Sequence, residues 1–364
     1  MRDTPRWYDY FLDSDFVSFW NSRLGETTVR PLVIFGIGFD PRALRVIEAL
    51  SQLRSKVTIG CLALEFQGRP AAGPAGQVTE EMVAANRTRL QALGNVKNEG
   101  TCVIAFQDAD GHSIAGHEVV RAIHANLQTV RAYSDVIVDI SAMPTDVFFP
   151  LLNYLVRECD RLNVSNLHVA ITEDPELDAA ITGQEYGRAD FFHTFRPRGP
   201  GSFVWLPLLG LNRREQLEKI HQQLGSGCVE ICPVLPFPAS KPRIGDDIVV
   251  AYRDLLFEAF EVAYENILYC DEGNPFDIYR KVVEVAQYYK TLDALKELPP
   301  VTTVLSPLSS KTLSLGMLLA AIERQLPVCS VVPGSYVLPT TLPLESRGAE
   351  RILEVWLAGE PYLI

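Results

Sequence analysis

The fold of this chain is constrained most by two successive series of apolar, strand-like runs. Each series holds five runs in the same order, and longer segments of helical periodicity separate them. Matched runs are 172 residues apart at the first pair, Leu32 and Val204, and 160 apart at the fifth, Leu167 and Pro327. The pairs are residues 32–42 and 204–214, 57–66 and 228–237, 101–105 and 266–270, 136–145 and 302–311, and 167–172 and 327–332. We interpret the second half as an internal duplication of the first. The alternative is chance similarity between regular chains.

The period of these runs indicates an α/β fold. Short, nearly continuous Val, Ile and Leu runs are typical of strands buried on both faces, and their alternation with helices requires crossover connections in a parallel sheet. The sequence therefore predicts two doubly wound, Rossmann-like parallel-sheet domains in tandem. Ligands of such folds bind outside the carboxyl ends of the strands, where helix N-termini present free N–H groups.

The chain is expected to divide at a segment rich in proline and glycine. We predict an aromatic helical segment at residues 1–29, a first domain at 30–185, a linker at 186–201 and a second domain at 202–364, ending in a helix at 344–358. The aromatic side chains of residues 1–29 either cover their own domain or contact a protein partner or second subunit. Both alternatives remain open from the sequence.

Composition excludes several classes of function. A net charge of −12 disfavours a general nucleic-acid-binding surface, although a small anion can still enter a local pocket. No apolar run is long enough to span a bilayer, and the N-terminus lacks a signal-peptide pattern, so we expect a cytoplasmic protein without membrane association. Seven cysteines, mostly within strand-like runs, predict no disulfides.

Common catalytic and metal motifs are absent from the sequence. It contains no HExxH, GxSxG or GxxxxGK[ST], and its histidines have no metal-ligand spacing. The sequence therefore predicts no metal site, identifies no catalytic residue and names no cofactor.

The turn after the first run of each half is the first candidate ligand site. Asp40 and Pro41 form a helix N-cap with proline at the first helical position, and Arg42 follows. Arg213 and Arg214 occupy the corresponding place in the second half. These residues either cap helices only or also contact a ligand.

The loop after the fourth run is the second candidate. It carries Ser141 and Thr145 in the first half and, in the second, Ser306, Ser309, Ser310 and Lys311. Hydroxyl groups and a lysine at a helix N-terminus can bind phosphate. Helix capping explains the serines equally well, but a lysine in the first turn opposes the helix dipole and favours a bound anion.

Acidic residues close or interrupt other runs. Glu65 and Asp271 could accept hydrogen bonds from ribose hydroxyls, or they could be solvated loop charges. Asp139 lies within the apolar run VIVDIS, where an unpaired carboxylate would be costly. We therefore expect a backbone N–H or Arg42 to be its partner.

Three segments carry a resemblance to a known family. DISAMPT at residues 139–145, SPLSSKT at 306–312 and GIGFDPRAL at 36–44 resemble elements of CARF-type (CRISPR-associated Rossmann fold) domains. The resemblance implies binding of cyclic oligonucleotides, usually by two-fold pairs of domains, and a role in prokaryotic antiviral defence. Asp40, Pro41 and Arg42 depart from the small polar residues of that family.

A second resemblance is to Rossmann-type methyltransferases. It depends on the glycine turn at Gly36 and Gly38, on Glu65 and on Asp108. The chain departs from that pattern because it lacks a GxGxG motif and has residues 141–144 (SAMP) where the catalytic loop would be.

The leading hypothesis is a sensor or accessory subunit that binds a nucleotide-like anionic ligand in a cleft between the two halves. The second is an enzyme that uses Asp40, Glu65 or Asp139 for S-adenosylmethionine-dependent methyl transfer or for nucleotide or glycosidic hydrolysis. The third is a structural subunit of a larger assembly.

Overall fold

A computed structural model describes most of the chain, which divides into two compact units. The described residues are 5–7, 11–12, 15–54, 56–67, 74–108, 113–162, 166–174, 177, 181–199, 201–294, 301–337 and 351–362. We call Tyr10–Glu185 with Gly334–Ile364 the seven-stranded unit, and Met1–Asp9 with Tyr186–Pro333 the five-stranded unit.

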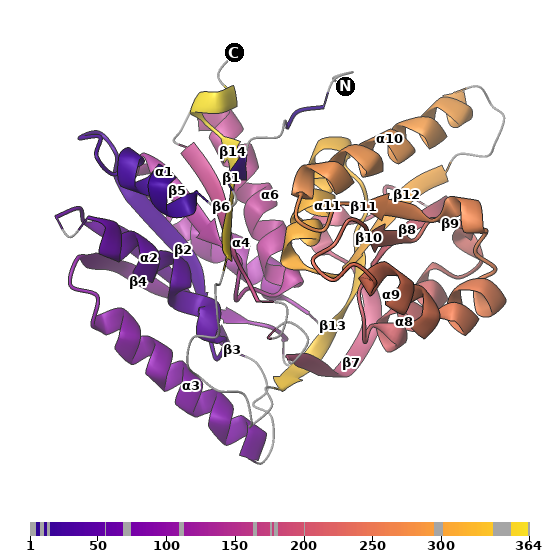
Figure 1. The fold of residues 1–364 in the computed structure, drawn as a ribbon, viewed down its shortest axis with the longest axis horizontal. Coiled ribbons are helices and arrows are strands. Elements are labelled where there is room, and N and C mark those ends of the chain that lie inside the picture. Colours follow the sequence, from indigo (N-terminus) through magenta and orange to yellow (C-terminus); the bar gives the residue numbers. More distant parts are fainter. Residues whose placement is uncertain are drawn as a thin grey trace. The chain divides into compact units, whose positions relative to one another are not determined.

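The sheet of the seven-stranded unit has the order β1-β14-β6-β5-β2-β3-β4 (Figure 1). Strands β6, β5, β2, β3 and β4 are parallel, whereas β14 is antiparallel to β6 and β1 is antiparallel to β14. All seven residues of β2 are buried, as expected for an apolar run at the centre of such a sheet. The strands are β1 Phe11–Leu12, β2 Pro31–Ile37, β3 Ile59–Gln67, β4 Val96–Ala105, β5 Asp135–Asp139, β6 Asn166–Glu173 and β14 Arg351–Ala358.

Helices cover both faces of this sheet. Side chains of α1 and α2, including Trp20 and Ile47, pack on Phe35 and Ile137 of the strands. Because side chains alternate along a strand, Val138 points to the opposite face, where α4 and α6 lie side by side (Figure 1). The elements are α1 Phe16–Arg23, η1 Pro41–Leu44, α2 Arg45–Leu53, α3 Pro74–Gln91, α4 Ala115–Ala125, α5 Leu127–Arg131, α6 Thr145–Leu162 and η6 Glu360–Tyr362.

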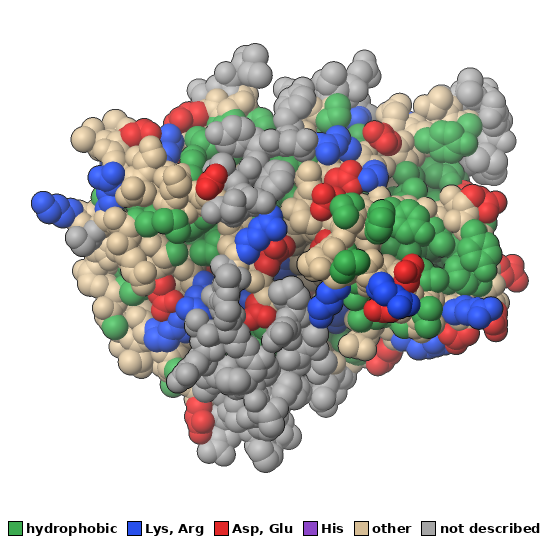
Figure 2. Space-filling view, viewed as in Figure 1, with side chains coloured by type: hydrophobic (Ala, Val, Ile, Leu, Met, Phe, Trp, Pro, Cys, Tyr) green, Lys and Arg blue, Asp and Glu red, His purple; other side chains and the backbone are tan. Residues whose placement is uncertain are grey.

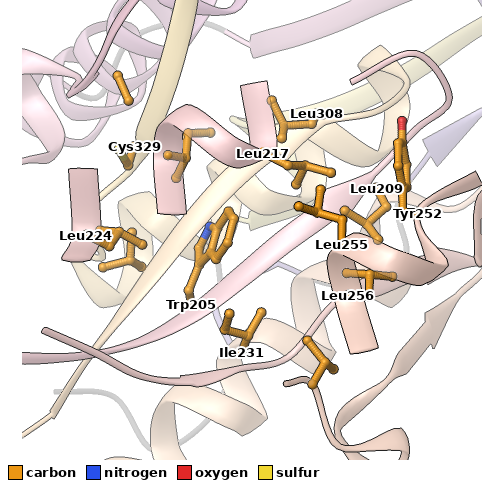
Figure 3. Close-up of a cluster of buried hydrophobic side chains, with 14 of the residues drawn as sticks. Trp205, Leu209, Leu217, Leu224, Ile231, Tyr252, Leu255, Leu256, Leu308 and Cys329 are labelled. Carbon is orange, nitrogen blue, oxygen red and sulfur yellow. The ribbon is translucent and has the colours of Figure 1, made fainter. Parts of the chain in front are cut away.

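The five-stranded unit has a second parallel sheet, with the order β11-β10-β8-β12 and with β9 also paired to β8. Trp205 of β8 lies at the centre of its core, among Leu217 and Leu224 of α8 and residues such as Leu255 (Figure 3). The strands are β8 Ser202–Leu209, β9 Cys228–Ile231, β10 Val234–Pro236, β11 Leu268–Cys270 and β12 Val301–Leu308. The helices are η2 His193–Phe195, α8 Arg214–Leu224, η3 Gly225–Gly227, α9 Ile244–Ala251, η4 Asp254–Ala259 (a π-helix), η5 Tyr264–Asn266, α10 Pro275–Ala294 and α11 Lys311–Arg324.

The two parallel sheets share one strand order. Strands β9 and β10 both pair with β8, and we count them as one strand. With the strands of each half then numbered along the chain, both sheets read 3-2-1-4, and a parallel bridge from Leu305 to Val328 adds the fifth run beside β12. The predicted α/β fold, with parallel sheets and alternating helices, is confirmed. Doubly wound folds share such orders without common ancestry, so the duplication stays a prediction.

The expected linker contains regular structure. Strand β7 (Thr182–Phe191) pairs with β13 (Cys329–Val337) in a two-stranded sheet, so residues 186–191 are strand and not a free connection. The chain divides inside both strands, after Glu185 and after Pro333.

The assignment of residues 202–364 to one domain and the helix at 344–358 are both wrong for residues 351–358. These residues form β14, which pairs with β6 of the seven-stranded unit. Residues 353–358 are all buried in this strand, and their burial and pairing outweigh the weak helical pattern. The rest of that predicted helix, residues 344–350, lies outside the described residues.

Aromatic side chains of residues 1–29 are buried within the chain itself. Phe16 and Trp20 pack in the seven-stranded unit, and Trp7 packs edge-on against Tyr279 in the five-stranded unit. These three side chains therefore act as core residues and are not available to a partner. Among the described helices, none combines the length and apolar character that a membrane span needs.

Candidate functional site

Each parallel sheet has a switch point between its first and fourth strands, β2 and β5 in one unit and β8 and β12 in the other. Glycine permits a close approach there. A Cβ atom on Gly36 would lie 3.3 Å from the carbonyl oxygen of Ala142, and one on Gly210 would lie 2.7 Å from that of Leu308. Within each unit, the structure therefore brings together the two loops that the sequence singled out. Ligands of doubly wound folds bind at such points.

Asp40 and Arg42 form a buried pair at the end of β2. Asp40 caps η1 by accepting a hydrogen bond from the Arg42 amide at 2.9 Å, and its other carboxylate oxygen accepts one from Arg42 Nη2 at 2.8 Å. Arg42 is only 3% exposed. Its charge is thus largely matched by Asp40, and an anion at this edge would find less attraction than a solvated arginine provides.

Asp139, at the end of β5, has the backbone partner that the sequence predicted. Its Oδ1 accepts hydrogen bonds from the amide and the hydroxyl of Ser141, at 3.0 and 2.5 Å. Its Oδ2 is buried without a hydrogen-bond partner among the described residues. Burial raises the pKa of Asp139 to about 7, and the nearby Asp40 adds to the shift, whereas the bonds from Ser141 and the charge of Arg42 oppose it.

The Ser141 hydroxyl is fully engaged inside the fold. Besides donating to Asp139, it accepts the backbone amide of Thr172 on β6 at 2.7 Å. Ser141 therefore joins β5 to β6 in this state and does not present a hydroxyl to a ligand. Thr145, the first residue of α6, is half-buried nearby in the chain.

Glu65 and Asn86 complete this edge. Glu65, near the end of β3, pairs with Arg87 at 2.6 Å, so a ribose would have to compete with that guanidinium. Asn86 of α3 donates from Nδ2 to the carbonyl oxygens of Gly38 and Asp40, at 2.7 and 3.0 Å. Sequence reasoning missed Asn86 because no local pattern distinguishes it within a helix.

In the five-stranded unit, the loop after β12 opens α11. Ser310 is the N-cap and accepts the amide of Leu313, and Lys311 is the first helical residue. Ser309 and Lys311 are half-buried. Ser306 lies deeper, with no exposed surface: it accepts Trp205 Nε1 at 2.9 Å and donates to the carbonyl of Cys329 at 2.7 Å. It therefore connects the core and is separate from the helix opening.

The other predicted residues of this unit make local contacts. Arg214 is exposed and pairs with Asp254 and Glu218, and Asp271 accepts the amide of Gly273 within its own turn. The Arg213 amide donates to the hydroxyl of Tyr252 at 2.7 Å, and that hydroxyl donates to the carbonyl of Gly210 at 2.6 Å. Tyr252, which the sequence did not indicate, holds the turn after β8.

A buried charged cluster around His168 was also missed. It lies toward the amino ends of β5 and β6, at the edge opposite the switch point, where Asp135 begins β5. Its members come from distant parts of the chain, so no motif could reveal it. Within the described ranges, no group of three or more His, Cys, Asp or Glu residues could hold a metal ion.

No protein-family model matches the chain. No curated protein matches it either. Among solved structures, it is similar to a triple-mutant deacetylase of the teicoplanin biosynthetic pathway, with 16% identity and a TM-score of 0.28 over 45% of this chain and 74% of that one. It is also similar to a universal stress protein from Archaeoglobus fulgidus DSM 4304, with 13% identity and a TM-score of 0.23 over 82% and 94%. Similarities at such TM-scores indicate nothing about activity. The fold class is established by the strand order.

Proposed function

We propose that the protein binds a nucleotide-like anionic ligand and acts as a sensor or accessory subunit. The opening of α11 carries this proposal. Ser309, Ser310 and Lys311 gather hydroxyl groups, amide donors and a cation at one helix N-terminus beside the β8–β12 switch point. Within the seven-stranded unit, Asp40 largely neutralises Arg42, so α11 of the five-stranded unit is the better place for an anion.

Isothermal titration calorimetry of the full chain tests this role. The probes are inorganic phosphate, AMP and a cyclic dinucleotide. We expect binding that Lys311→Ala weakens about tenfold or more, the loss of one charge-assisted contact, while Lys56→Ala, an exposed lysine of the other unit, leaves it unchanged. Equal affinity in the wild type and Lys311→Ala would remove Lys311 from the site. Mass spectrometry of co-purified small molecules would identify a natural ligand.

A role in prokaryotic antiviral defence belongs to the same proposal. Its support is the resemblance of residues 36–44, 139–145 and 306–312 to CARF-type domains. A cyclic oligonucleotide that binds more tightly than AMP and phosphate would favour it, and AMP that binds as tightly would oppose it.

One observation favours an enzyme as the second candidate. Asp139 is a buried carboxyl group at the switch point, and one of its oxygens has no hydrogen-bond partner among the residues that the structure describes. Its pKa of about 7 suits a general acid or base. Nucleotide hydrolysis lost in Asp139→Asn but kept in Asp174→Asn would support this role. For methyl transfer, S-adenosylmethionine should raise the melting temperature of the wild type and not of Glu65→Ala.

A protein partner is favoured by exposed aromatic side chains on the five-stranded unit. Phe237, Tyr264, Tyr269 and Tyr288 are each about half or more exposed, and Figure 2 shows hydrophobic side chains gathered on the visible face of this unit. A structural subunit would use this surface, because Trp7, Phe16 and Trp20 of residues 1–29 are buried. Light scattering of the wild type and of Phe237→Ser with Tyr269→Ser would show a lower mass for the variant if it joins copies of this chain.

A further inference from the structure

His168 is a completely buried histidine between two carboxylates. Its Nδ1 lies 2.7 Å from Glu354 Oε1, and its Nε2 lies 3.4 Å from Asp135 Oδ1. The rings of Trp356, Trp20 and Phe19 surround the imidazole, with ring centroids 4.6, 5.2 and 6.1 Å from the imidazole centroid. Water is excluded from the ring, so its charge must be matched by the protein.

The other charged groups of the cluster define that match. Arg23, at the end of α1, donates from Nε to Asp135 Oδ1 at 2.9 Å and from its other two nitrogens to Glu360. Ser134 Oγ donates to Asp135, and Trp20 Nε1 donates to Glu354. Arg23 divides its hydrogen bonds between Asp135 and Glu360, so an imidazolium at His168 supplies the second buried positive charge beside Asp135 and Glu354.

The imidazolium joins elements that are far apart in the chain. Asp135 and His168 belong to the parallel part of the sheet, whereas Glu354 belongs to β14, which pairs antiparallel with β6. Arg23 and Trp20 bring α1 to the same point. Glu360, which follows β14, is held by Arg23 and by Asn166 Nδ2 at 3.1 Å. The cluster therefore adds side-chain contacts to the backbone pairing that holds β14 on β6.

Solvent reaches the rim of this cluster. A surface cavity of about 360 Å³ is lined by Arg23, Glu26 and Glu360 together with Phe19, Ser22, Trp356 and Pro361. Solvent therefore reaches Arg23 and Glu360, the two residues that connect the cluster to the surface.

We propose that His168 is a proton-dependent clasp: with its second proton it holds β14 and α1 on the sheet, and when that proton is lost β14 separates from β6. Burial by itself lowers the pKa of His168, but the charge of Glu354 and the contact with Asp135 outweigh it and leave the pKa above its usual 6.5. The clasp is therefore closed below pH 6.5 and opens as the pH rises from 6.5 through this raised pKa.

Hydrogen–deuterium exchange of the full chain between pH 6 and 9 tests the clasp. Protection factors, corrected for intrinsic exchange, should fall in peptides that cover residues 351–358. The expected fall is about tenfold per pH unit between 6.5 and the raised pKa, because opening then releases one proton. Peptides from β3 and β8 should keep constant protection. NMR titration of the imidazole should give a midpoint above 6.5.

Two variants and one control complete the test. His168→Gln cannot carry the charge, so protection of β14 should be low already at pH 6 and independent of pH. If that variant does not fold, Glu354→Gln should lower the His168 midpoint, so that the loss of protection ends at a lower pH and is smaller in total. His124→Gln, which removes a histidine bonded to Tyr154 in the same unit, should behave as the wild type. Constant β14 protection across the range, or an imidazole midpoint at or below 6.5, would overturn the proposal.

Discussion

Ser141 donates two hydrogen bonds to one oxygen of Asp139, from its amide and its hydroxyl, and the other oxygen of that carboxylate is buried with no hydrogen-bond partner in the described part of the chain. At the switch point of the seven-stranded unit, hydrogen bonds therefore offset the cost of burying one oxygen of this carboxyl group but not the other. This arrangement explains how a charged residue type persists within an apolar strand. It also makes the protonation of Asp139 a property of the folded state.

The first prediction concerns Asp139 and pH. Its folded pKa of about 7 exceeds the ordinary 3.8, so its contribution to stability is complete below pH 3.8 and is lost as pH rises through 7. The free energy of unfolding should fall by up to about 1.4 kcal/mol per pH unit across that window. Asp139→Asn, whose side chain at position 139 is always neutral, should lack this part of the pH dependence of the free energy of unfolding. Urea unfolding at pH 5 and 8 measures it, and equal pH slopes in the two proteins would contradict the pKa shift.

The second prediction concerns the close approach at Gly210. A Cβ atom there would lie 2.7 Å from the carbonyl oxygen of Leu308, which is backbone and cannot rotate away. Gly210→Ala should therefore lower the free energy of unfolding by about 1–3 kcal/mol. Gly201→Ala is the matched control, because a Cβ atom there meets nothing within 4 Å. Chemical denaturation of both variants is the measurement, and equal midpoints would show that the two loops can separate.

The third prediction separates Ser306 from the helix opening. Ser306→Ala leaves the buried indole N–H of Trp205 without its acceptor, which should cost about 1–3 kcal/mol of stability. Ser309→Ala, at a half-buried position three residues later, should cost less. Ser309→Ala should weaken anion binding at α11 more than Ser306→Ala does. A Ser306→Ala protein that keeps full stability but loses anion binding would place Ser306 in the site.

The fourth prediction concerns cysteine reactivity. Burial raises the pKa of Cys329 and of Cys270 to about 12, so neither forms the reactive thiolate at pH 8. In the native protein both should resist alkylation by iodoacetamide, and both should react once urea unfolds the chain. Peptide mass mapping of alkylated protein reads out each site. Rapid native labelling of Cys329 would show that its strand opens readily.

Several features of the candidate site follow from the sequence because they are local. The glycines at 36 and 210 end apolar runs, Asp40 and Ser310 cap the helices that follow, and Asp139 finds a backbone amide two residues away. Each relation spans a few residues, so spacing and residue type suffice to predict it.

Other features depended on contacts that no local pattern encodes. The sequence did not distinguish the engaged hydroxyl of Ser306 from that of Ser309, because the difference lies in the indole of Trp205, about a hundred residues earlier. Asn86 of α3 and Tyr252, which directly follows α9, hold the two switch-point turns. Side chains that contact residues far away in the sequence leave no periodic pattern by which they could be predicted.

The sequence by itself determined the two parallel sheets, since continuous apolar runs can be buried only as central strands between helices. Only the tertiary structure decided that residues 351–358 are a strand of the seven-stranded unit and that His168 lies between Asp135 and Glu354. Pairing with a distant edge and matching of buried charge are properties of the assembled fold. Their energies depend on neighbours that the chain brings together only when it is folded.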